Sequence, residues 1–382
     1  MSDRSFVSAP VADAPGSPGA IILEPPSAVP PRILVLYNEP VLPADHPDAG
    51  SEHDILDTVA DTFKILNAAG FATRKLGINY SPQPLLDELK AHPPDAVFNL
   101  FEGLATHPET EVSVASLLEW LRVPFTGCPS TSMVLGRDKL LAKHLMAAAG
   151  LPTAEYEIVA AAPGPQWRHA WPAIVKPANQ DASVGIDQKS VVTSQEELDD
   201  RVRFVVEKFG GPALVERYIA GREFHVHMIE DADARGTPLV LPLAEIAFDR
   251  SVLGRWDVYT FTAKWDEHSD EYRTAPLKAP VMIPADDFAR LQAIAERSYR
   301  TLHCRDYARI DVRMADDGSF YVLEMNPNPY LNSLALVNGL MAIGRTHEQQ
   351  IVAMALAALT RGGITVPEGE IRIPVGVVTV LY

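Results

Sequence analysis

The stretch that most constrains the fold of this chain is residues 307–326, where Asp317-Gly318 separates two segments of alternating polar and apolar residues. An Asp-Gly pair between such segments is a strong signal of a β-hairpin closed by a two-residue type I′ turn. Because side chains alternate along a strand, the predicted pairing gives the hairpin one apolar face that should pack on a core. That face consists of Ala308, Ile310, Val312, Met314, Tyr321, Leu323 and Met325.

The other face of the predicted hairpin is polar. In the register that the turn sets, Asp311 lies directly opposite Glu324, and Arg309 lies opposite Asn326. Two carboxylates that face each other across a strand pair repel one another, but a hard divalent cation with oxygen ligands would bind between them. Mg²⁺ accepts one or two carboxylates together with phosphate oxygens, and the Asn326 amide oxygen can complete the set. A solvated polar face is the alternative, and the apolar opposite face and the adjacent Asn-Pro-Asn-Pro sequence argue against it.

Strands and helices alternate along the first part of the chain. Residues 1–31 are rich in Pro, Ala and Ser, and we expect them to form a disordered tail. The apolar run that follows is typical of a buried parallel strand. Continued alternation of strands and helices favours a parallel sheet, and no GxGxxG dinucleotide fingerprint follows the first strand. The expected elements are strands 33–37, 72–76 and 95–100 and helices 52–69 and 82–91.

The rest of the chain divides into two further blocks. In the central block a helix begins at Asp138 and ends at Gly150, and two strands, 213–218 and 223–229, close the subdomain. The C-terminal block contains a polar loop, 249–274, of a length that is usually functional or disordered. Its other elements are helices 284–302 and 346–361 and the hairpin. The expected domains are the tail 1–31, an N-terminal α/β domain 32–127, a central subdomain 128–230 and a C-terminal subdomain 231–382.

Composition limits the class of protein. Hydrophobic residues make up 47% and charged residues 22% of the 382 residues, which is ordinary for globular domains. The formal net charge of −17 argues against nucleic acid and anionic lipid as partners. Cys128 and Cys304 lack the spacing of a zinc site or a disulfide framework, and we expect buried, reduced thiols. No apolar run approaches the roughly 18 residues of a membrane span, so we expect a cytoplasmic protein.

The hairpin motifs carry a resemblance to a known family. Arg309-x-Asp311, followed by Glu324-x-Asn326 and a proline, resembles the metal-binding end of the D-alanine–D-alanine ligases in the ATP-grasp superfamily. The resemblance implies an α/β and α+β ATP-grasp fold, with an N-terminal parallel α/β domain, a small central domain and a C-terminal domain with a mixed or antiparallel sheet. It also implies that Asp311, Glu324 and Asn326 ligate two Mg²⁺ ions, with Mn²⁺ as an alternative. Arg309 would stabilise charge on the transferring phosphoryl group and on the tetrahedral intermediate.

Other motifs follow in the order that the same family shows. Lys176 ends an apolar strand and Lys139 opens a helix, and a lysine at such positions is usually a solvated surface charge. By resemblance, backbone N–H groups of the loop that contains Ser183 cradle the β- and γ-phosphates, and the loop 249–274 closes as a lid. The implied ATP site consists of Glu216 and the backbone around Tyr218 and Ile219 for the adenine, Glu223 for the ribose, and Lys139, Lys176, Ser183 and Lys264 for the phosphates.

The expected amino-acid pocket departs from the family pattern. Ala182 stands where the family has a serine, Trp265 where it has a tyrosine, and Glu102 where it has a histidine. In the second-substrate segment, Tyr330 replaces a glycine and Ala335 replaces a serine. Lost polar contacts leave charged substrate groups unpaired, so we expect substrates other than two D-alanines. The candidate substrate residues are Glu52, Glu102, Trp265, Tyr330 and Ser333.

We therefore predict an ATP- and Mg²⁺-dependent carboxylate–amine ligase that forms ADP and joins two amino acids or related acids through an acyl phosphate. One alternative is a true D-alanine–D-alanine ligase of peptidoglycan synthesis. An alternative of another class is a nucleotide-binding protein without ligase turnover, and the complete set of Arg309, Asp311, Glu324 and Asn326 argues against it. The expected partners are small amino-acid-like molecules, with neither nucleic acid nor membrane, and a homodimer is left open.

Overall fold

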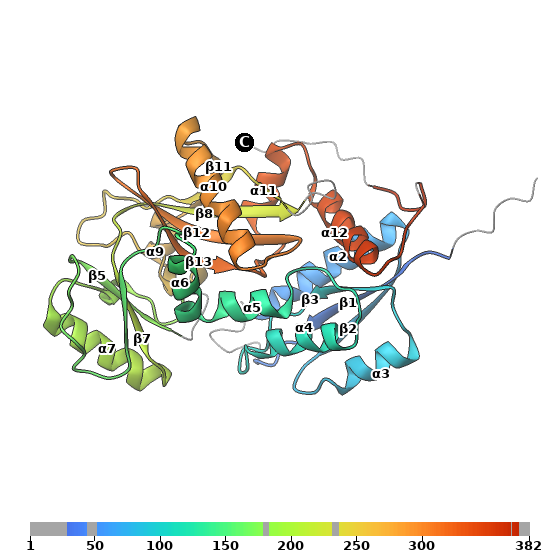
Figure 1. Cartoon of the computed structure of the whole chain (residues 1–382), viewed down its shortest axis with the longest axis horizontal. Coiled ribbons are helices and arrows are strands. Elements are labelled where there is room, and N and C mark those ends of the chain that lie inside the picture. Colours follow the sequence, from blue (N-terminus) through green and yellow to red (C-terminus); the bar gives the residue numbers. More distant parts are fainter. Residues whose placement is uncertain (1–28, 44–51, 179–182, 231–236, 368, 374–382) are drawn as a thin grey trace, which may run out of the picture.

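Three β-sheets form the framework of the part of the chain that the structure describes. The computed structural model describes residues 29–43, 52–178, 183–230, 237–367 and 369–373. The three sheets follow one another along the chain and occupy separate regions in Figure 1, and their mixture of parallel and antiparallel strands with helices confirms the predicted α/β and α+β fold class. Among the described residues, no helix combines the length and the apolar character needed to cross a membrane.

The N-terminal domain is a parallel sheet with helices on both faces. Its elements are β1 (Arg32–Asn38), α2 (Ile55–Ala69), β2 (Ala72–Ile78), α3 (Gln83–Ala91), β3 (Ala96–Leu100) and α4 (Thr110–Trp120). The strands are ordered β2-β1-β3 and pair in parallel, as the alternating sequence predicted. Side chains of β1 alternate between two cores, because Ile33 and Val35 pack with α2 whereas Leu34 and Leu36 pack with α3 and α4.

A four-stranded antiparallel sheet forms the central part of the chain. Its elements are β4 (Tyr156–Val159), β5 (Ala173–Pro177), β6 (Val191–Val192), α7 (Gln195–Phe209) and β7 (Ala213–Arg217). The strand order is β4-β7-β5-β6. Ser194 caps α7 by accepting a hydrogen bond from the N–H of Glu197, and Gly210 ends the helix in the left-handed conformation. The apolar side of α7 covers one face of this sheet, and the opposite face borders the cavity that is described below.

The C-terminal sheet has its longest strand, β8, in the middle. Its strands are β8 (Gly221–Glu230), β9 (Pro238–Val240), β10 (Leu243–Ile246), β11 (Leu277–Val281), β12 (Tyr307–Ala315) and β13 (Phe320–Asn326). The order is β11-β10-β8-β12-β13, and β9 also pairs with β8. The expectation that strand 223–229 closes the central sheet is wrong, because Phe224 and Val226 pack in the same core as Ile310 and Val312 of β12. Its local sequence suits either antiparallel sheet, and only these long-range contacts decide between them.

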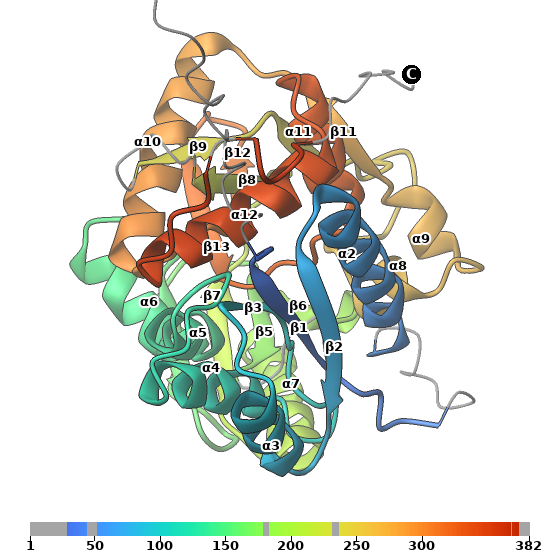
Figure 2. The same cartoon turned by 90° about the vertical axis from the view of Figure 1, so that its right-hand side faces the viewer.

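Helices cover the C-terminal sheet on both sides. They are α5 (Ser130–Arg137), α6 (Lys139–Ala148), α10 (Ala285–Thr301), α11 (Leu334–Ala342) and α12 (His347–Arg361). Helices α6 and α10 pack on one face. Helices α11 and α12 share a second core with α2 and β1, and α2 and α12 lie side by side in Figures 1 and 2. The polar segment 249–274, expected to be a loop, contains two short helices, α8 (Phe261–Trp265) and α9 (Asp270–Thr274).

The hairpin of β12 and β13 has the predicted register at its open end. Arg309 pairs with Asn326, and Asp311 pairs with Glu324. Closer to the turn the register shifts by one residue, and Leu323 is the extra residue. A bulge of this kind places two residues of one strand opposite one residue of its partner and bends the bulged strand.

The turn of the hairpin is one residue longer than predicted. The N–H of Ala315 donates to the carbonyl of Ser319, so residues 316–318 form the loop, and Gly318 has a φ of +80°. This is the three-residue hairpin loop that ends in a left-handed glycine. The predicted two-residue turn is therefore wrong. The longer loop and the bulge offset each other, which is why the polar pairs at the open end still oppose one another as predicted.

The bulge also changes which side chains of β13 face the core. Tyr321 and Leu323 were expected on the apolar face, but Phe320 and Val322 occupy that core instead. Leu323 lines the cavity described below, and Tyr321 pairs with Arg313. The reason is that a slip of one residue in a strand moves every side chain beyond it to the opposite face.

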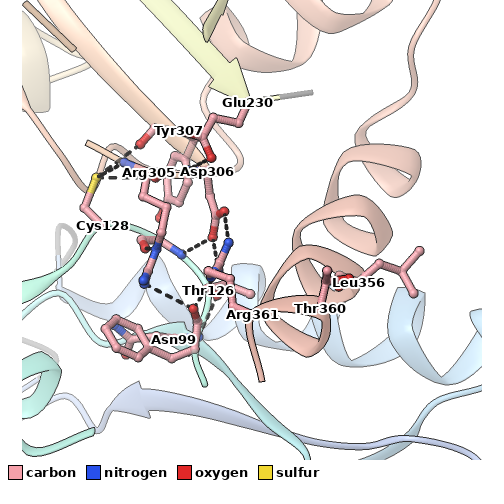
Figure 3. A network of polar contacts seen from close by, with 12 residues as sticks. Asn99, Thr126, Cys128, Glu230, Arg305, Asp306, Tyr307, Leu356, Thr360 and Arg361 are labelled. Atoms are coloured by element: carbon pink, nitrogen blue, oxygen red, sulfur yellow. Dashed lines mark hydrogen bonds and ion pairs between the residues drawn. The ribbon is translucent and has the colours of Figure 1, made fainter. Parts of the chain in front are cut away.

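A buried polar network ties the N-terminal domain to the C-terminal sheet (Figure 3). Asp306 is 2% exposed and accepts the N–H of Gly127 at 2.7 Å. Arg361 of α12 donates twice to the same carboxylate, each time at 2.7 Å. Arg305 donates to the carbonyls of Gly127 and Phe125 at 2.7 and 3.2 Å. These contacts join three segments that are far apart in the sequence.

Candidate active site

One cavity collects most of the residues predicted for nucleotide and metal binding. It lies between the central sheet and the C-terminal sheet and receives side chains from β5, β7, β8, β12 and β13 as well as from α6 and α8. Every residue assigned to ATP from the sequence lines it, and so do three residues assigned to the metal and the phosphoryl group. These residues are Lys139, Lys176, Ser183, Glu216, Tyr218, Ile219, Glu223, Lys264, Arg309, Asp311 and Glu324.

A row of polar side chains crosses β8 and β12 on the side of the cavity. Alternate residues of a strand share a face, so every second residue of each strand belongs to the row. In the antiparallel register the paired residues are Glu223 with Arg313, His225 with Asp311, and His227 with Arg309.

The two carboxylates of the hairpin each lie next to a cation. Arg309 holds Asp311 in a fork, with 2.7 Å from Nε to Oδ1 and 2.9 Å from Nη2 to Oδ2. The Lys139 ammonium lies 3.8 Å from Oε2 of Glu324. Burial opposes the charge of Arg309, but Asp311 and Glu324 raise its pKa. The repulsion expected between the carboxylates is therefore balanced by charges of the protein itself.

The donor set at this end of the hairpin fits a hard divalent cation. Asp311, Glu324 and Asn326 offer carboxylate and amide oxygens, which are the ligands that Mg²⁺ prefers. The Asn326 Oδ1 accepts the N–H of Asn328 at 2.9 Å, and this bond orients the amide. Within the described ranges, no group of three or more His, Cys, Asp or Glu side chains is arranged to hold a metal ion. A pair of carboxylates with one amide leaves positions for phosphate oxygens and water, as Mg²⁺ sites for nucleotides do.

A buried ion triad joins α6, β5 and β7 at the edge of the cavity. Glu216 lies 2.6 Å from the ammonium of Lys143 and 2.8 Å from that of Lys176. Lys143 is 1% exposed and also donates to the Thr153 hydroxyl at 2.5 Å and to the Val322 carbonyl at 3.3 Å. Burial opposes the ionisation of Glu216, but the two lysines lower its pKa to about 2. The carboxylate expected to read the adenine is thus engaged by two lysines.

Glu223, expected to bind the ribose, is also held by a cation. Nη2 of Arg313 lies 2.8 Å from its Oε2. The same arginine donates to the Gly221 carbonyl at 3.2 Å and to the carbonyl of Asp257. Burial raises the pKa of Glu223, and Arg313 opposes that shift. The arginine therefore fixes this carboxylate against the chain segment that precedes α8.

The expected phosphate loop is described from Ser183 onward, and Ala182 lies outside the described residues. Ser183 has a φ of +64°, and its hydroxyl donates to the Tyr259 carbonyl at 3.0 Å. Gly185 has a φ of +76°, and a Cβ there would lie 2.7 Å from the ring of Phe209. Both the backbone conformation and the close packing therefore require glycine at this position.

Comparison with known families agrees with the geometry. The family model described as "D-ala D-ala ligase C-terminus" matches residues 145–355, which is more than half of the chain. The chain belongs to the D-alanine–D-alanine ligase family. The matched range contains the whole central sheet and the hairpin, and the family predicted from the hairpin motifs is confirmed.

Individual relatives show how far the likeness extends. An uncharacterized protein of Sinorhizobium fredii is 31% identical over 261 residues, which cover 67% of this chain and 72% of that protein. A D-alanine–D-alanine ligase of Desulforudis audaxviator is 31% identical over 229 residues, which cover 59% and 69%. A crystal structure of the D-alanine–D-alanine ligase from Bacillus anthracis complexed with ATP has a TM-score of 0.63 at 19% identity, covering 86% of this chain and 97% of that one. The shared fold confirms the predicted ATP-grasp architecture.

The residues predicted to hold the amino acids lie apart from the lining of the nucleotide cavity, as does the predicted metal ligand Asn326. The carboxylate of Glu52 accepts backbone N–H groups of Val41, Leu42 and Ala105 at 2.9, 2.7 and 3.4 Å. These bonds tie the segment after β1 to the segment after β3, and the expected contact of Glu52 with a substrate stays a prediction.

Two of the other predicted substrate residues, Trp265 and Ser333, lie at helix ends, and Tyr330 lies in the connection between β13 and α11. Tyr330 donates its hydroxyl to the Asp54 carbonyl at 3.2 Å, and Ser333 caps α11 by accepting the N–H of Leu336. Trp265 is the last residue of α8, with the Lys264 ammonium 5.2 Å from the centre of its ring. Tyr330 therefore links the second-substrate segment to the residue preceding α2.

Glu102 lies in acidic surroundings. Burial raises its pKa to about 8, and Glu111 and Asp54 add to the shift while Lys264 opposes it. Its own N–H donates to the Asn38 side chain at 3.1 Å. A carboxyl of this kind is close to neutral at pH 7, and a cationic group placed beside it would favour its charged form.

Several residues of the site were missed by sequence reasoning. Lys143 follows Lys139 by four residues, and side chains at that spacing lie on the same face of a helix. Arg313 and His225 each follow a predicted site residue by two positions, and side chains at that spacing share a face of a strand. Strand alternation, which located the metal pair, could therefore have identified Arg313 and His225, and helical spacing could have identified Lys143.

Proposed function

We propose that this protein is an ATP- and Mg²⁺-dependent carboxylate–amine ligase that releases ADP and joins two amino acids or related acids through an acyl phosphate. The observation that carries the proposal is the convergence of Lys139, Lys176 and Lys264 with Asp311 and Glu324 in one cavity. Cations and a carboxylate pair brought together from three parts of the chain suit a nucleoside triphosphate and its metal ion.

Each residue of the proposed site has a role that suits its surroundings. Asp311, Glu324 and Asn326 would hold Mg²⁺, which when bound neutralises charge on the phosphates. The three lysines of the cavity would bind phosphate oxygens. Arg309, fixed by its fork on Asp311, would stabilise the charge that develops on the transferring phosphoryl group. Charges fixed before the reaction cost no reorganisation when it occurs, and phosphoryl transfer depends mainly on such positioning and electrostatics.

The proposed reaction has two steps. A carboxylate oxygen of the first substrate attacks the γ-phosphorus of ATP, the bond to the β-phosphate oxygen breaks, and an acyl phosphate and ADP result. The uncharged amine of the second substrate then attacks the acyl carbon, the tetrahedral intermediate expels phosphate, and the nitrogen loses a proton. Because water would hydrolyse the acyl phosphate, we propose that α8 and α9 close over the cavity.

We propose that the best substrate pair differs from two D-alanines. Glu102 puts a carboxyl with acidic neighbours where the family has a histidine, which changes the charge at that position. Tyr330 and Ala335 further change the size and polarity of the second-substrate segment relative to the family pattern. The second candidate is D-alanine–D-alanine ligation, which family membership favours.

The decisive experiment measures ADP release across a panel of D- and L-amino acids, with the mass of each product determined. A pair other than two D-alanines should give the highest kcat/KM. If D-alanine gives the highest value, the second candidate is correct. Absence of ADP release with every pair would contradict ligase function itself.

Two carboxylate variants test the metal assignment. Glu324→Gln and Asp311→Asn should each lower ADP formation by roughly 10²-fold or more, because each removes a charge-stabilising ligand. Glu324→Gln should leave the melting temperature nearly unchanged, whereas Asp311→Asn should lower it because Arg309 loses a buried partner. Chelation by EDTA should abolish activity in the unaltered protein, and Mg²⁺ or Mn²⁺ should restore it. Full activity in the Glu324 variant would rule out the site as assigned.

A further inference from the structure

His227 is a buried histidine whose ring has no hydrogen-bond partner within the described residues. Its side chain belongs to a residue that is 3% exposed, and both Nδ1 and Nε2 are unpaired. Buried polar groups are nearly always hydrogen-bonded, and an unpaired one destabilises the folded protein. Burial, followed by Arg309 and His225, lowers the pKa of His227 well below its usual value. The ring is therefore neutral near pH 7 and offers one N–H donor and one acceptor nitrogen.

The position of His227 on β8 places it on the face of the sheet that carries the site. Phe224, Val226 and Met228 face the core that α10 covers. Glu223 and His225, which alternate with them, line the nucleotide cavity. The next residue on that face is His227, about 7 Å further along the strand at 3.3–3.4 Å per residue. His227 therefore follows His225, the partner of Asp311, by two residues along β8. Glu223, the carboxylate predicted to bind the ribose, lies on the opposite side of His225 along the strand.

The neighbours of His227 belong to the reacting end of the site. Across the sheet it pairs with Arg309, the residue proposed to stabilise the transferring phosphoryl group. Helix α11 contacts β8, and its Leu336 and Leu340 share a core with Ile229, which follows His227 on the same face. The second-substrate segment leads directly into α11 through its cap, Ser333. His227 is thus flanked by Arg309 and by the helix that follows this segment.

We infer that His227 is a specificity-determining residue that donates its ring N–H to the carboxylate of the amine-bearing substrate. The inference rests on the proposed ligase function and assigns one buried residue to the carboxylate of its second substrate. Two observations support this assignment. The ring has an unused donor in the interior of the protein, and Arg309 beside it makes the location favourable for an anion. Ala335, buried near the start of α11, supplies no side-chain donor in its place.

The test compares the amine-bearing amino acid with its carboxamide, which keeps the amine and loses the negative charge. His227→Leu removes both nitrogens at similar volume, and His227→Gln keeps a donor. In His227→Leu the KM for the amino acid should rise roughly tenfold or more, the cost expected for one hydrogen bond to a charged group. The preference for carboxylate over carboxamide should fall by a similar factor. The KM for ATP should stay within about twofold, and the melting temperature should hold or rise because an unpaired group has been removed.

The matched variant separates recognition from packing. His227→Gln should retain most of the preference for the carboxylate, although its side chain differs in shape. If both variants keep the KM and the preference of the unaltered protein, the ring is satisfied by a buried water molecule and the inference is wrong. A KM for ATP that rises in parallel with that for the amino acid would also overturn it, because the effect would then be structural.

A binding measurement covers the case in which neither variant folds. Nitrogen-15 spectra of the histidine rings, recorded on the unaltered protein with ADP and Mg²⁺, should show both His227 nitrogens shifting when the amino acid is added and not when its carboxamide is added. Unchanged His227 signals would overturn the inference. Ring shifts without ADP release by any substrate pair would support the binding site while contradicting the ligase function, so the two proposals fail separately.

Discussion

Lys143 shows how individual buried charges hold the site together. It is a buried residue of α6 whose ammonium contacts Glu216 of the central sheet, the Thr153 hydroxyl and the carbonyl of Val322 in the C-terminal sheet. Burial lowers its pKa, and Glu216 opposes that shift. Because Lys176 contacts the same carboxylate, Lys143 positions a residue of the nucleotide cavity without lining the cavity itself.

Replacement of Lys143 by methionine should therefore destabilise the protein more than it alters the site. The substitution leaves the buried Glu216 carboxylate with one cation fewer, and loss of one partner of a buried ion pair costs about 3–5 kcal/mol. Chemical denaturation measures that loss. Glu216 keeps Lys176 as a partner in this variant, whereas Glu216→Gln leaves both lysines without their shared carboxylate and should cost more. A single variant as stable as the unaltered protein would contradict the buried triad.

Glu102 gives a second residue-scale expectation, in the pH dependence of stability. Its folded-state pKa of about 8 lies above the ordinary value of 4.5, so between these values the folded protein binds more protons than the unfolded chain. Stability from this group is therefore lost as pH rises from about 5 to 8, by at most about 1.4 kcal/mol per pH unit for one proton. Glu102→Gln should remove that slope. Denaturation curves of both proteins at pH 5, 6.5 and 8 provide the measurement, and parallel curves would contradict the shifted carboxyl.

At the scale of elements, the turn at Gly185 couples the expected phosphate loop to the central sheet. Its positive φ and the closeness of Phe209 leave no room for a Cβ. Gly210, which ends α7, has a similar φ of +67° but nothing within 4 Å of the Cβ position, and it does not line the cavity. A comparison of alanine variants at the two glycines therefore distinguishes the effect of backbone strain alone from an effect on the expected phosphate loop.

Gly185→Ala and Gly210→Ala should both lose about 1–2 kcal/mol from the strain of a left-handed alanine. Gly185→Ala should lose more, because the ring of Phe209 must also move. The rise in melting temperature that ATP and Mg²⁺ produce should shrink in Gly185→Ala and persist in Gly210→Ala. Equal ATP-induced rises in the two variants would show that the loop does not bind the phosphates.

On the scale of the whole molecule, the network around Asp306 connects the N-terminal domain to the C-terminal sheet. Asp306 has a φ of +63°, which asparagine also tolerates. Asp306→Asn therefore keeps the backbone shape and removes the charge that Arg361 contacts. It should cost about 1.5–3 kcal/mol, as for hydrogen bonds to a charged group. Asp270→Asn, which breaks an exposed ion pair with Arg273, should change stability little. Similar losses in both variants would contradict a special role for the network.

The sequence by itself determined the features that depend on short-range periodicity. The alternating elements of residues 33–100 predicted a parallel sheet, which β1, β2 and β3 form. The alternation in 307–326 placed Asp311 opposite Glu324 on a polar face. These features are readable because side-chain direction repeats every two residues in a strand, whatever the rest of the chain does.

The tertiary structure decided what depends on residues far apart in the chain. The bulge at Leu323 offsets a turn that is one residue longer than predicted, so the polar pairs keep the predicted register. Strand β8 belongs to the C-terminal sheet because its apolar residues pack in the same core as those of β12. Lys143 and His227 look like ordinary residues of a helix and a strand, and their significance comes from the buried surroundings that other segments create. Burial and register are properties of the assembled core, since packing energy and hydrogen-bond satisfaction are shared among segments that local periodicity does not connect.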